Sequence, residues 1–96
     1  MLNKVIIMEL SDEMLTEISY VKISKYRTKV MMSLDGEVKI PSQIAKDANI
    51  YQNHISNTLR QLKDHNLVEC INPEVKKGRL YRLTDKGENI ISKIND

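Results

Sequence analysis

The stretch PSQIAKDANIYQNHISNTLRQLKDH, residues 41–65, holds two helical patterns on either side of a short break. Pro41 suits the first position of a helix, because its missing N–H has no helical partner there in any case. The first pattern places three small or apolar residues on one face: Ile44, Ala45 and Ala48. The second runs over residues 52–65 and repeats at i, i+4 and i+7, with Ile55, Leu59 and Leu62 facing inward. The stretch therefore predicts two helices that meet at a corner.

The spacing of residues around the break is typical of a helix-turn-helix. Two helices that cross steeply need a small residue where they touch, and Ala45 supplies it. The corner needs a residue that tolerates positive φ, and Asn49 stands there. The second helix needs an apolar anchor further on, which Ile55 provides. We therefore interpret residues 41–65 as a helix-turn-helix.

Two further helical patterns precede the motif. Ser11 is followed by two acids and is a good helix start, after which Met14, Ile18 and Val21 repeat on one face. Ser24 starts a second helix that ends at Asp35-Gly36, with an inward face of Tyr26, Val30, Met31 and Leu34. Residues 2–10 are apolar enough for a strand or for the front of a helix, and periodicity does not decide between the two.

After Asn66 the hydrophobic period changes from that of a helix to that of a strand. Residues 67–71 and 79–84 alternate as the two strands of a hairpin, with residues 72–78 as its turn. Thr84 then caps a last helix, whose inward residues are Ile90, Ile91 and Ile94. Val38-Lys39-Ile40 is long enough for only one rung of sheet. This order of elements predicts an α+β, mainly α, winged helix: a three-helix core, a β-hairpin wing, and extra helices at the N- and C-terminal ends.

Composition and length exclude several classes of protein. The 96 residues, of which 41% are hydrophobic and 29% charged, are typical of one soluble globular domain. No apolar run approaches the ~20 residues of a membrane span, and the first residues lack the cleavage site of a signal peptide. We expect a cytoplasmic protein that does not enter a membrane. A single cysteine, Cys70, cannot form an internal disulfide, which fits a reducing cytoplasm, and we expect it to be a small core residue.

The sequence carries no pattern of catalytic or metal-binding residues. It has no nucleophile–base pair, no glycine-rich phosphate loop and no paired carboxylate motif, so we expect that the protein is not an enzyme. His54 and His65 are eleven residues apart on one predicted helix and do not converge with Cys70, so we also expect no metal and no cofactor. The sequence shows no evident pocket for a small-molecule effector.

Charge is unevenly distributed, although the net charge is only +2. The charged residues among residues 1–20 are four acids, Glu9, Asp12, Glu13 and Glu17, and one base, Lys4. Two basic clusters follow, made of Lys22, Lys25, Arg27 and Lys29 and of Lys76, Lys77, Arg79 and Arg82. Such a polarised surface suits a polyanion, but lysines that are merely solvated would give the same pattern.

Four segments together resemble winged helix-turn-helix transcription regulators of the MarR and ArsR kind, especially small archaeal ones. They are SKYRTKVMMSL (24–34), IPSQIAKDANI (40–50), HISNTLRQLKDHNLVEC (54–70) and KKGRLYRLTDKG (76–87). The resemblance implies sequence-specific binding of double-stranded DNA, with the recognition helix 52–65 in the major groove and the wing 72–79 on the backbone or minor groove. Residues 24–96 would form the DNA-binding domain.

The resemblance also implies a homodimer, because an N-terminal helix often builds the dimer in such proteins. Residues 1–23 would be the dimerisation element. The apolar face of this segment exceeds what so short a core needs, and it consists of Ile6, Met8, Met14, Leu15, Ile18 and Val21.

Three positions depart from the pattern of these regulators. Asn49 and Asn66 stand where the family usually has glycine, and Asn is the residue other than glycine that most readily accepts a left-handed conformation. Tyr51 replaces the usual small hydroxyl cap, which costs ~1 kcal/mol if nothing else caps the helix. Two interpretations of Tyr51 stay open: an exposed ring without a role, or a hydroxyl that contacts a phosphate.

The face of the recognition helix opposite Ile55 and Leu59 is rich in amides, which suit base edges. We expect base contacts from Asn53, Asn57, Arg60 and Gln61. We expect contacts to the DNA backbone from Tyr51, Gln52, Ser56, Lys63, Lys25 and Arg27. On the wing, we expect contacts from Lys76, Lys77 and Arg79. The alternative is a winged-helix module of the transcription machinery that binds proteins without sequence-specific DNA binding.

Overall fold

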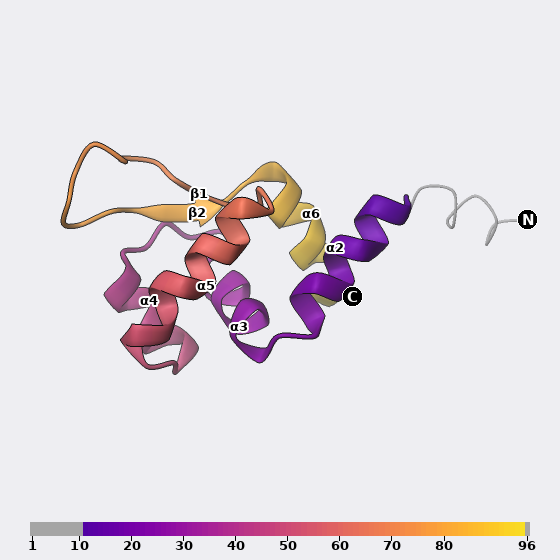
Figure 1. Cartoon of the computed structure of the whole chain (residues 1–96), viewed down its shortest axis with the longest axis horizontal. Coiled ribbons are helices and arrows are strands. Elements are labelled where there is room, and N and C mark those ends of the chain that lie inside the picture. Colours follow the sequence, from indigo (N-terminus) through magenta and orange to yellow (C-terminus); the bar gives the residue numbers. More distant parts are fainter. Residues whose placement is uncertain (1–10, 96) are drawn as a thin grey trace, which may run out of the picture.

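The structure is a computed structural model, and it describes residues 11–95 (Figure 1). In that range the chain forms α2 (Asp12–Lys22), α3 (Lys25–Ser33), α4 (Pro41–Ala48), α5 (Gln52–Asp64), β1 (Val68–Cys70), β2 (Tyr81–Leu83) and α6 (Asp85–Asn95). This order confirms the predicted winged helix, with mainly helical content and one small sheet. The expectations for residues 2–10 lie outside the described residues. None of the helices from Asp12 to Asn95 is long and apolar enough to cross a membrane.

The corner between α4 and α5 forms as the sequence predicts. Pro41 is the first residue of α4, and Asn49 ends it in the left-handed region, at φ 56° and ψ 51°. The N–H of Ile50 donates to the carbonyl of Ala45 across the turn, at 3.0 Å. Asn66, which directly follows the C-cap His65 of α5, is also left-handed, at φ 59°. Both asparagines therefore adopt the conformation that glycine usually supplies.

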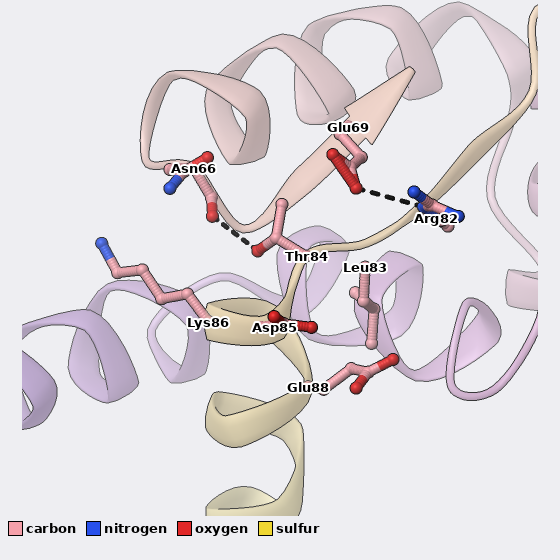
Figure 2. Close-up of a pocket in the computed structure, with 8 residues that line it drawn as sticks. All are labelled: Asn66, Glu69, Arg82, Leu83, Thr84, Asp85, Lys86 and Glu88. Atoms are coloured by element: carbon pink, nitrogen blue, oxygen red, sulfur yellow. Dashed lines mark hydrogen bonds and ion pairs between the residues drawn. The ribbon is translucent and has the colours of Figure 1, made fainter. Parts of the chain in front are cut away.

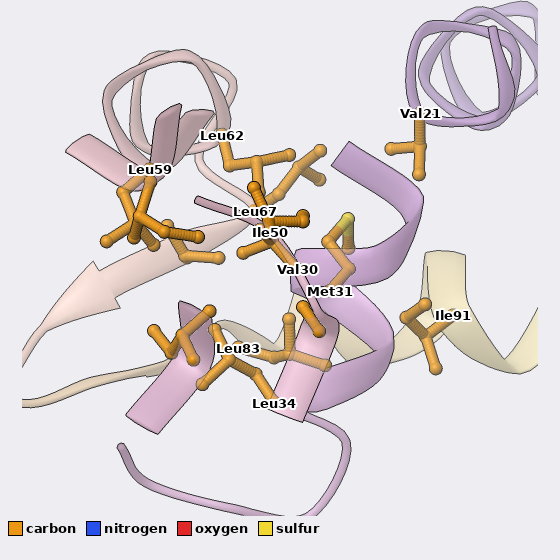
Figure 3. Packing of buried hydrophobic residues seen from close by; sticks show 14 of the residues in the cluster. Val21, Val30, Met31, Leu34, Ile50, Leu59, Leu62, Leu67, Leu83 and Ile91 are labelled. Carbon is orange, nitrogen blue, oxygen red and sulfur yellow. The ribbon is translucent and has the colours of Figure 1, made fainter. Parts of the chain in front are cut away.

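The core lies between all the helices and the base of the sheet. Figure 3 shows Val30, Met31 and Leu34 of α3 between the apolar side chains of α5 and Ile91 of α6. The other buried apolar residues are Val21, Ile44, Ala45, Ala48, Ile50, Ile55, Leu59, Leu62, Leu67, Val68, Leu83 and Ile90. Tyr26 is not among them and is 40% exposed, which corrects its predicted inward position. It lies in the first turn of α3, and its ring stacks on His54 of α5 with centroids 4.9 Å apart.

The wing is a hairpin whose strands are shorter than predicted. β1 and β2 pair antiparallel, with Val68 opposite Leu83 and Cys70 opposite Tyr81. One more backbone bond follows, from the Ile71 N–H to the Leu80 carbonyl, but the Leu80 N–H donates to the side chain of Asn72 instead of to a backbone carbonyl. Lys39 pairs with Tyr81 on the other edge of β2, which confirms the single predicted rung.

The prediction for Cys70 is wrong, whereas the prediction for Thr84 is confirmed. Cys70 is half-buried and not a core residue, and its Sγ lies 3.6 Å from Asn72 Oδ1, at the start of the wing loop. Thr84 caps α6 as predicted, because its Oγ1 accepts from the Gly87 N–H at 3.0 Å. A Cβ at residue 87 would lie 2.1 Å from the Leu67 carbonyl oxygen, so only glycine lets α6 start this close to β1.

Candidate nucleic-acid interface

One face of α5 is polar and exposed along its whole length. The opposite face is buried and holds Ile55, Thr58, Leu59 and Leu62. The exposed residues are Gln52, Asn53, Ser56, Asn57, Arg60, Lys63 and Asp64, and all of them except Asp64 are predicted DNA contacts. Their amide, hydroxyl and guanidinium groups offer both donors and acceptors to a groove.

Arg60 and Asn57 form a pair in the middle of this face. They are three residues apart, and Arg60 Nη2 donates to Asn57 Oδ1. The contact uses the Asn57 amide oxygen and one guanidinium donor, so the Asn57 amide N–H groups and the other donors of Arg60 stay available to a ligand. Paired side chains of this kind lose less rotamer freedom when they meet a ligand, so the pair is a preorganised group of donors.

The polar face of α5 borders a concave surface built from three elements. Its lining comes from the N-terminus of α4, from α5 and from the wing: Pro41, Ser42, Gln52, Ser56, Lys76, Lys77, Gly78, Arg79 and Tyr81. A neighbouring hollow adds Leu59, Arg60 and Lys63 to the same side of the molecule. The recognition helix and the wing are thus brought together on one surface, which we call the basic cleft.

Ser42 also lies in the basic cleft, although it is not among the DNA contacts predicted from the sequence. It is exposed at the second position of α4, directly after Pro41. A hydroxyl directly after a proline that begins a helix is the local signal that could have identified it.

The three predicted wing residues differ in what they contact. Lys76 and Lys77 are exposed, and neither forms an ion pair within residues 11–95. Arg79 instead turns back onto the wing, where Nε donates to the Val75 carbonyl at 2.7 Å and Nη2 to the Pro73 carbonyl at 3.3 Å. The lysines are therefore free to meet an anion, whereas two of the five N–H donors of Arg79 already have partners within the wing.

The structure places Arg27 and Gln61 away from the exposed face of α5. Arg27 Nε donates to Gln61 Oε1 at 3.1 Å, and both side chains are half-buried. Arg27 Nη1 also donates to the carbonyl of Tyr20, and its guanidinium lies 3.8 Å from the centroid of the Tyr20 ring. Gln61 is three residues from the buried Thr58 on α5, and its contact with a base, like the backbone contact of Arg27, stays a prediction. Lys25 remains exposed in the first turn of α3.

A polar cluster joins α2, the end of α5 and α6. His65 Nδ1 lies 2.8 Å from Glu17 Oε2, and Lys86 Nζ lies 3.0 Å from Glu17 Oε1. Lys86 also donates to the His65 carbonyl at 3.1 Å, and the His65 ring stacks on Tyr20 with centroids 3.6 Å apart. The sequence does not distinguish Glu17 from the other acids of the N-terminal segment, because no pattern near Glu17 indicates its distant partners.

The neighbours of Glu17 lower the pKa of its carboxyl. Burial raises the pKa of the Glu17 carboxyl, but hydrogen bonds from His65 and Lys86 and their positive charges lower it by more. The net effect holds the pKa of Glu17 below its ordinary value. His65 is thus in a structural contact, and within residues 11–95 no group of three or more His, Cys, Asp or Glu side chains could hold a metal ion.

A second hollow lies at the base of the wing and carries both signs of charge (Figure 2). Arg82 is paired there with Glu69 at 3.1 Å, and the Thr84 hydroxyl donates to the Asn66 carbonyl at 2.7 Å. Asp85 and Glu88 add negative charge. This balance of charge does not suit a phosphate backbone, so the basic cleft is the better candidate for nucleic acid.

Comparison with known proteins identifies the family. The winged helix-turn-helix family model matches residues 27–96, and the chain therefore belongs to the winged helix-turn-helix family. No curated protein sequence matches this chain significantly.

Several solved structures share the fold at low sequence identity. A MarR family transcriptional regulator from Silicibacter pomeroyi DSS is 23% identical with a TM-score of 0.69, over 98% of this chain and 63% of that one. Lactococcus lactis ZitR, a C30AH42A mutant, is 16% identical with a TM-score of 0.66, over 75% of this chain and 50% of that one. NadR in complex with 4-hydroxyphenylacetate is 19% identical with a TM-score of 0.66, over 99% of this chain and 71% of that one. The chain thus spans about half to two thirds of ZitR and the Silicibacter regulator, and the likeness concerns the fold.

Proposed function

We propose that this protein is a cytoplasmic transcription regulator that binds double-stranded DNA in its basic cleft and is not an enzyme. The observation that carries the proposal is the arrangement of the amide-rich face of α5 beside the free lysines of the wing. The family supports it, since the fold is shared with MarR family transcriptional regulators. The major groove is about 12 Å wide and admits a helix such as α5.

In this proposal some residues contact the bases of the DNA and others contact its phosphates. Asn53, Asn57 and Arg60 lie centrally on the exposed face and read base edges. Gln52, Ser56 and Lys63 flank them and hold the helix against phosphates, with Lys25 and Tyr51 at the edge of the surface. Lys76 and Lys77 neutralise phosphates beside the wing.

Fluorescence anisotropy with labelled random duplex DNA at several salt concentrations tests the proposal. The logarithm of the binding constant should fall linearly with the logarithm of salt concentration, because phosphate contacts release counterions. If no duplex binds even at low salt, the regulator proposal is wrong and a protein-interaction module becomes the better reading. Selection from a pool of random duplexes then tests whether binding depends on sequence.

We further propose that residues 1–23 form a homodimer. Leu15 is 46% and Ile23 79% exposed, which leaves apolar surface on and after α2 for a partner. One member of the predicted dimer face does not contribute, because Val21 is fully buried in the core of its own chain. Met14 and Ile18 are partly buried against the same core, and Ile6 and Met8 lie outside the described residues.

A further inference from the structure

The side chain of Asn72 joins both arms of the wing where the strand ladder ends. Its Oδ1 accepts from the Leu80 N–H at 2.7 Å, and its Nδ2 donates to the Gly78 carbonyl at 3.1 Å. The Cys70 thiol lies 3.6 Å from the same Oδ1. Asn72 itself belongs to the arm that follows β1, and its amide thus bonds twice to the arm that leads into β2.

Arg79 makes a second set of bonds across the same loop. Its guanidinium reaches from the returning arm to the carbonyls of Val75 and Pro73 in the outgoing arm. Within the outgoing arm, the Val75 N–H donates to the Asn72 carbonyl at 3.2 Å and closes a turn. Asn72 and Arg79 together close the loop of residues 72–79, and we call the pair the wing clasp.

The strands alone do little to order this loop. Each has three residues, and the last backbone bond between the arms runs from the Ile71 N–H to the Leu80 carbonyl at 2.9 Å. Beyond it, the side chains of Asn72 and Arg79 make the bonds between the two arms of the loop that carries Lys76 and Lys77, while the Val75 N–H bond lies within one arm. A loop that must become ordered on binding loses affinity through its entropy, whereas one already ordered does not.

We propose that Asn72 and Arg79 are positioning residues for DNA binding, which hold Lys76 and Lys77 on the rim of the basic cleft. The inference rests on the proposed function, and it changes the role of Arg79. Its Nε and Nη2 are directed to carbonyls of the wing, so Arg79 acts through the shape of the loop more than through its charge.

The first test needs no DNA. Amide hydrogen exchange, measured by NMR on the full chain, should show that the Leu80 N–H loses its protection in Asn72→Ala. It should stay protected in Asn89→Ala, a matched control on the exposed side of α6. The amides of α3 and α5 should keep their protection in both variants, which shows that the fold is intact. A Leu80 N–H that stays protected in Asn72→Ala overturns the clasp.

The second test is a set of double variants in the anisotropy assay. Asn72→Ala should weaken binding about tenfold, as expected if about a tenth of the free protein then holds the competent wing. In a chain that already carries Lys76→Ala and Lys77→Ala, Asn72→Ala should cause no further loss. Combined with Arg60→Ala, its effect should add in full. An equal loss with and without the wing lysines overturns the inference, since it indicates a general structural effect.

Arg79→Lys separates shape from charge. Lysine keeps the positive charge but lacks the fork that spans two carbonyls, so it should lose as much affinity as Arg79→Ala. Wild-type affinity in Arg79→Lys would show a contact by charge and overturn the role assigned to Arg79. If the wild-type chain binds no duplex, the proposed function fails together with the DNA role of the clasp. A protected Leu80 amide in Asn72→Ala, by contrast, removes the clasp alone.

Discussion

Tyr51 stands directly before the recognition helix and leaves its first turn without a side-chain cap. Its ring is 81% exposed, and no side chain accepts a hydrogen bond from the first N–H groups of α5. A residue that weakens a helix start can persist where its side chain serves a ligand. The backbone of Tyr51 is extended, at φ −61° and ψ 138°, which is the conformation that a serine cap also uses.

We expect that Tyr51→Ser raises the free energy of unfolding by about 1 kcal/mol, because its hydroxyl can cap α5. Urea unfolding followed by circular dichroism measures this. Tyr51→Phe keeps the ring and should leave stability unchanged, but it should bind DNA more weakly if the hydroxyl contacts a phosphate. Equal DNA affinity in wild type and Tyr51→Phe would remove that contact, and an unchanged unfolding midpoint in Tyr51→Ser would contradict the cap argument.

Arg60 and Lys77 provide a second prediction at the scale of single residues. Arg60→Ala should relax the preference for one base at one position and cost about 1–3 kcal/mol on the preferred sequence. Lys77→Ala should weaken binding to all duplexes alike and reduce the salt slope by about one, as for a single phosphate contact. Competition between selected and random duplexes at two salt concentrations distinguishes the effects. A loss of base preference in Lys77→Ala would contradict these roles.

At the scale of elements, Glu17 is the link that fixes α2 to the rest of the domain. Its carboxylate is bonded to residues from two other elements, His65 at the end of α5 and Lys86 in α6. The Tyr20 ring lies between the His65 ring and the Arg27 guanidinium, which extends the contact to α3. The orientation of α2 is therefore set by charge and stacking as well as by the apolar contact of Val21.

The lowered pKa of Glu17 gives this link a defined pH dependence. A carboxyl whose pKa is lower in the folded state stabilises the protein at pH values above its ordinary pKa of 4.5. That contribution is lost as the pH falls from 4.5 through the folded value. Glu17→Gln should lower the free energy of unfolding at pH 7 by about 2 kcal/mol, because the half-buried His65 and Lys86 lose a charged acceptor. It should also remove part of the decline in stability below pH 4.5.

Glu13→Gln is the matched control for this prediction. Glu13 lies one turn earlier in α2, its side chain is 80% exposed, and it lies 3.9 Å from the same lysine. Exposed pairs of this kind contribute little, so the variant should unfold like the wild type at pH 7. Urea unfolding at pH 7 and at pH 3.5 compares the three chains. Identical curves for Glu17→Gln and Glu13→Gln would show that the link does not stabilise α2.

The elements that could be predicted from the sequence are those whose cause is local. Asn49 and Asn66 fix two chain reversals by their own conformational preferences, and Pro41 and Thr84 mark helix starts. The exposed face of α5 follows from periodicity alone. These signals need no knowledge of distant parts of the chain.

The features that the sequence did not predict are those in which a distant residue supplies the decisive contact. Gln61 is predicted to contact DNA, and nothing in the sequence indicates that it also accepts from Arg27 on another helix. The strand alternation continues past Cys70, yet the side chain of Asn72 takes the place of the next ladder bond. No spacing within α5 or the hairpin indicates either partner, so both features depended on the tertiary structure.

At the scale of the whole molecule, the basic cleft and α2 lie at opposite ends. Figure 1 shows the wing and the start of α5 on one side and α2 on the other, beyond α6. A partner that binds α2 would therefore not cover the cleft. The proposed homodimer would leave both clefts open, and a two-fold axis would suit a palindromic site whose half-sites are about 34 Å apart.

We expect that the wild-type chain elutes with the mass of a dimer of its 11.1 kDa chain in size-exclusion chromatography with light scattering. Leu15→Lys should shift it to the monomer, because the half-exposed leucine would place a charge in the dimer contact. The same variant should lose affinity for a duplex with two half-sites but keep it for a single half-site, since linked binding is lost while the cleft is intact. Met32→Lys is the matched control, as Met32 is similarly exposed at 49% but lies on α3. A wild-type chain that is a monomer at every concentration would contradict the dimer, while leaving the binding of single half-sites to decide the role of the cleft.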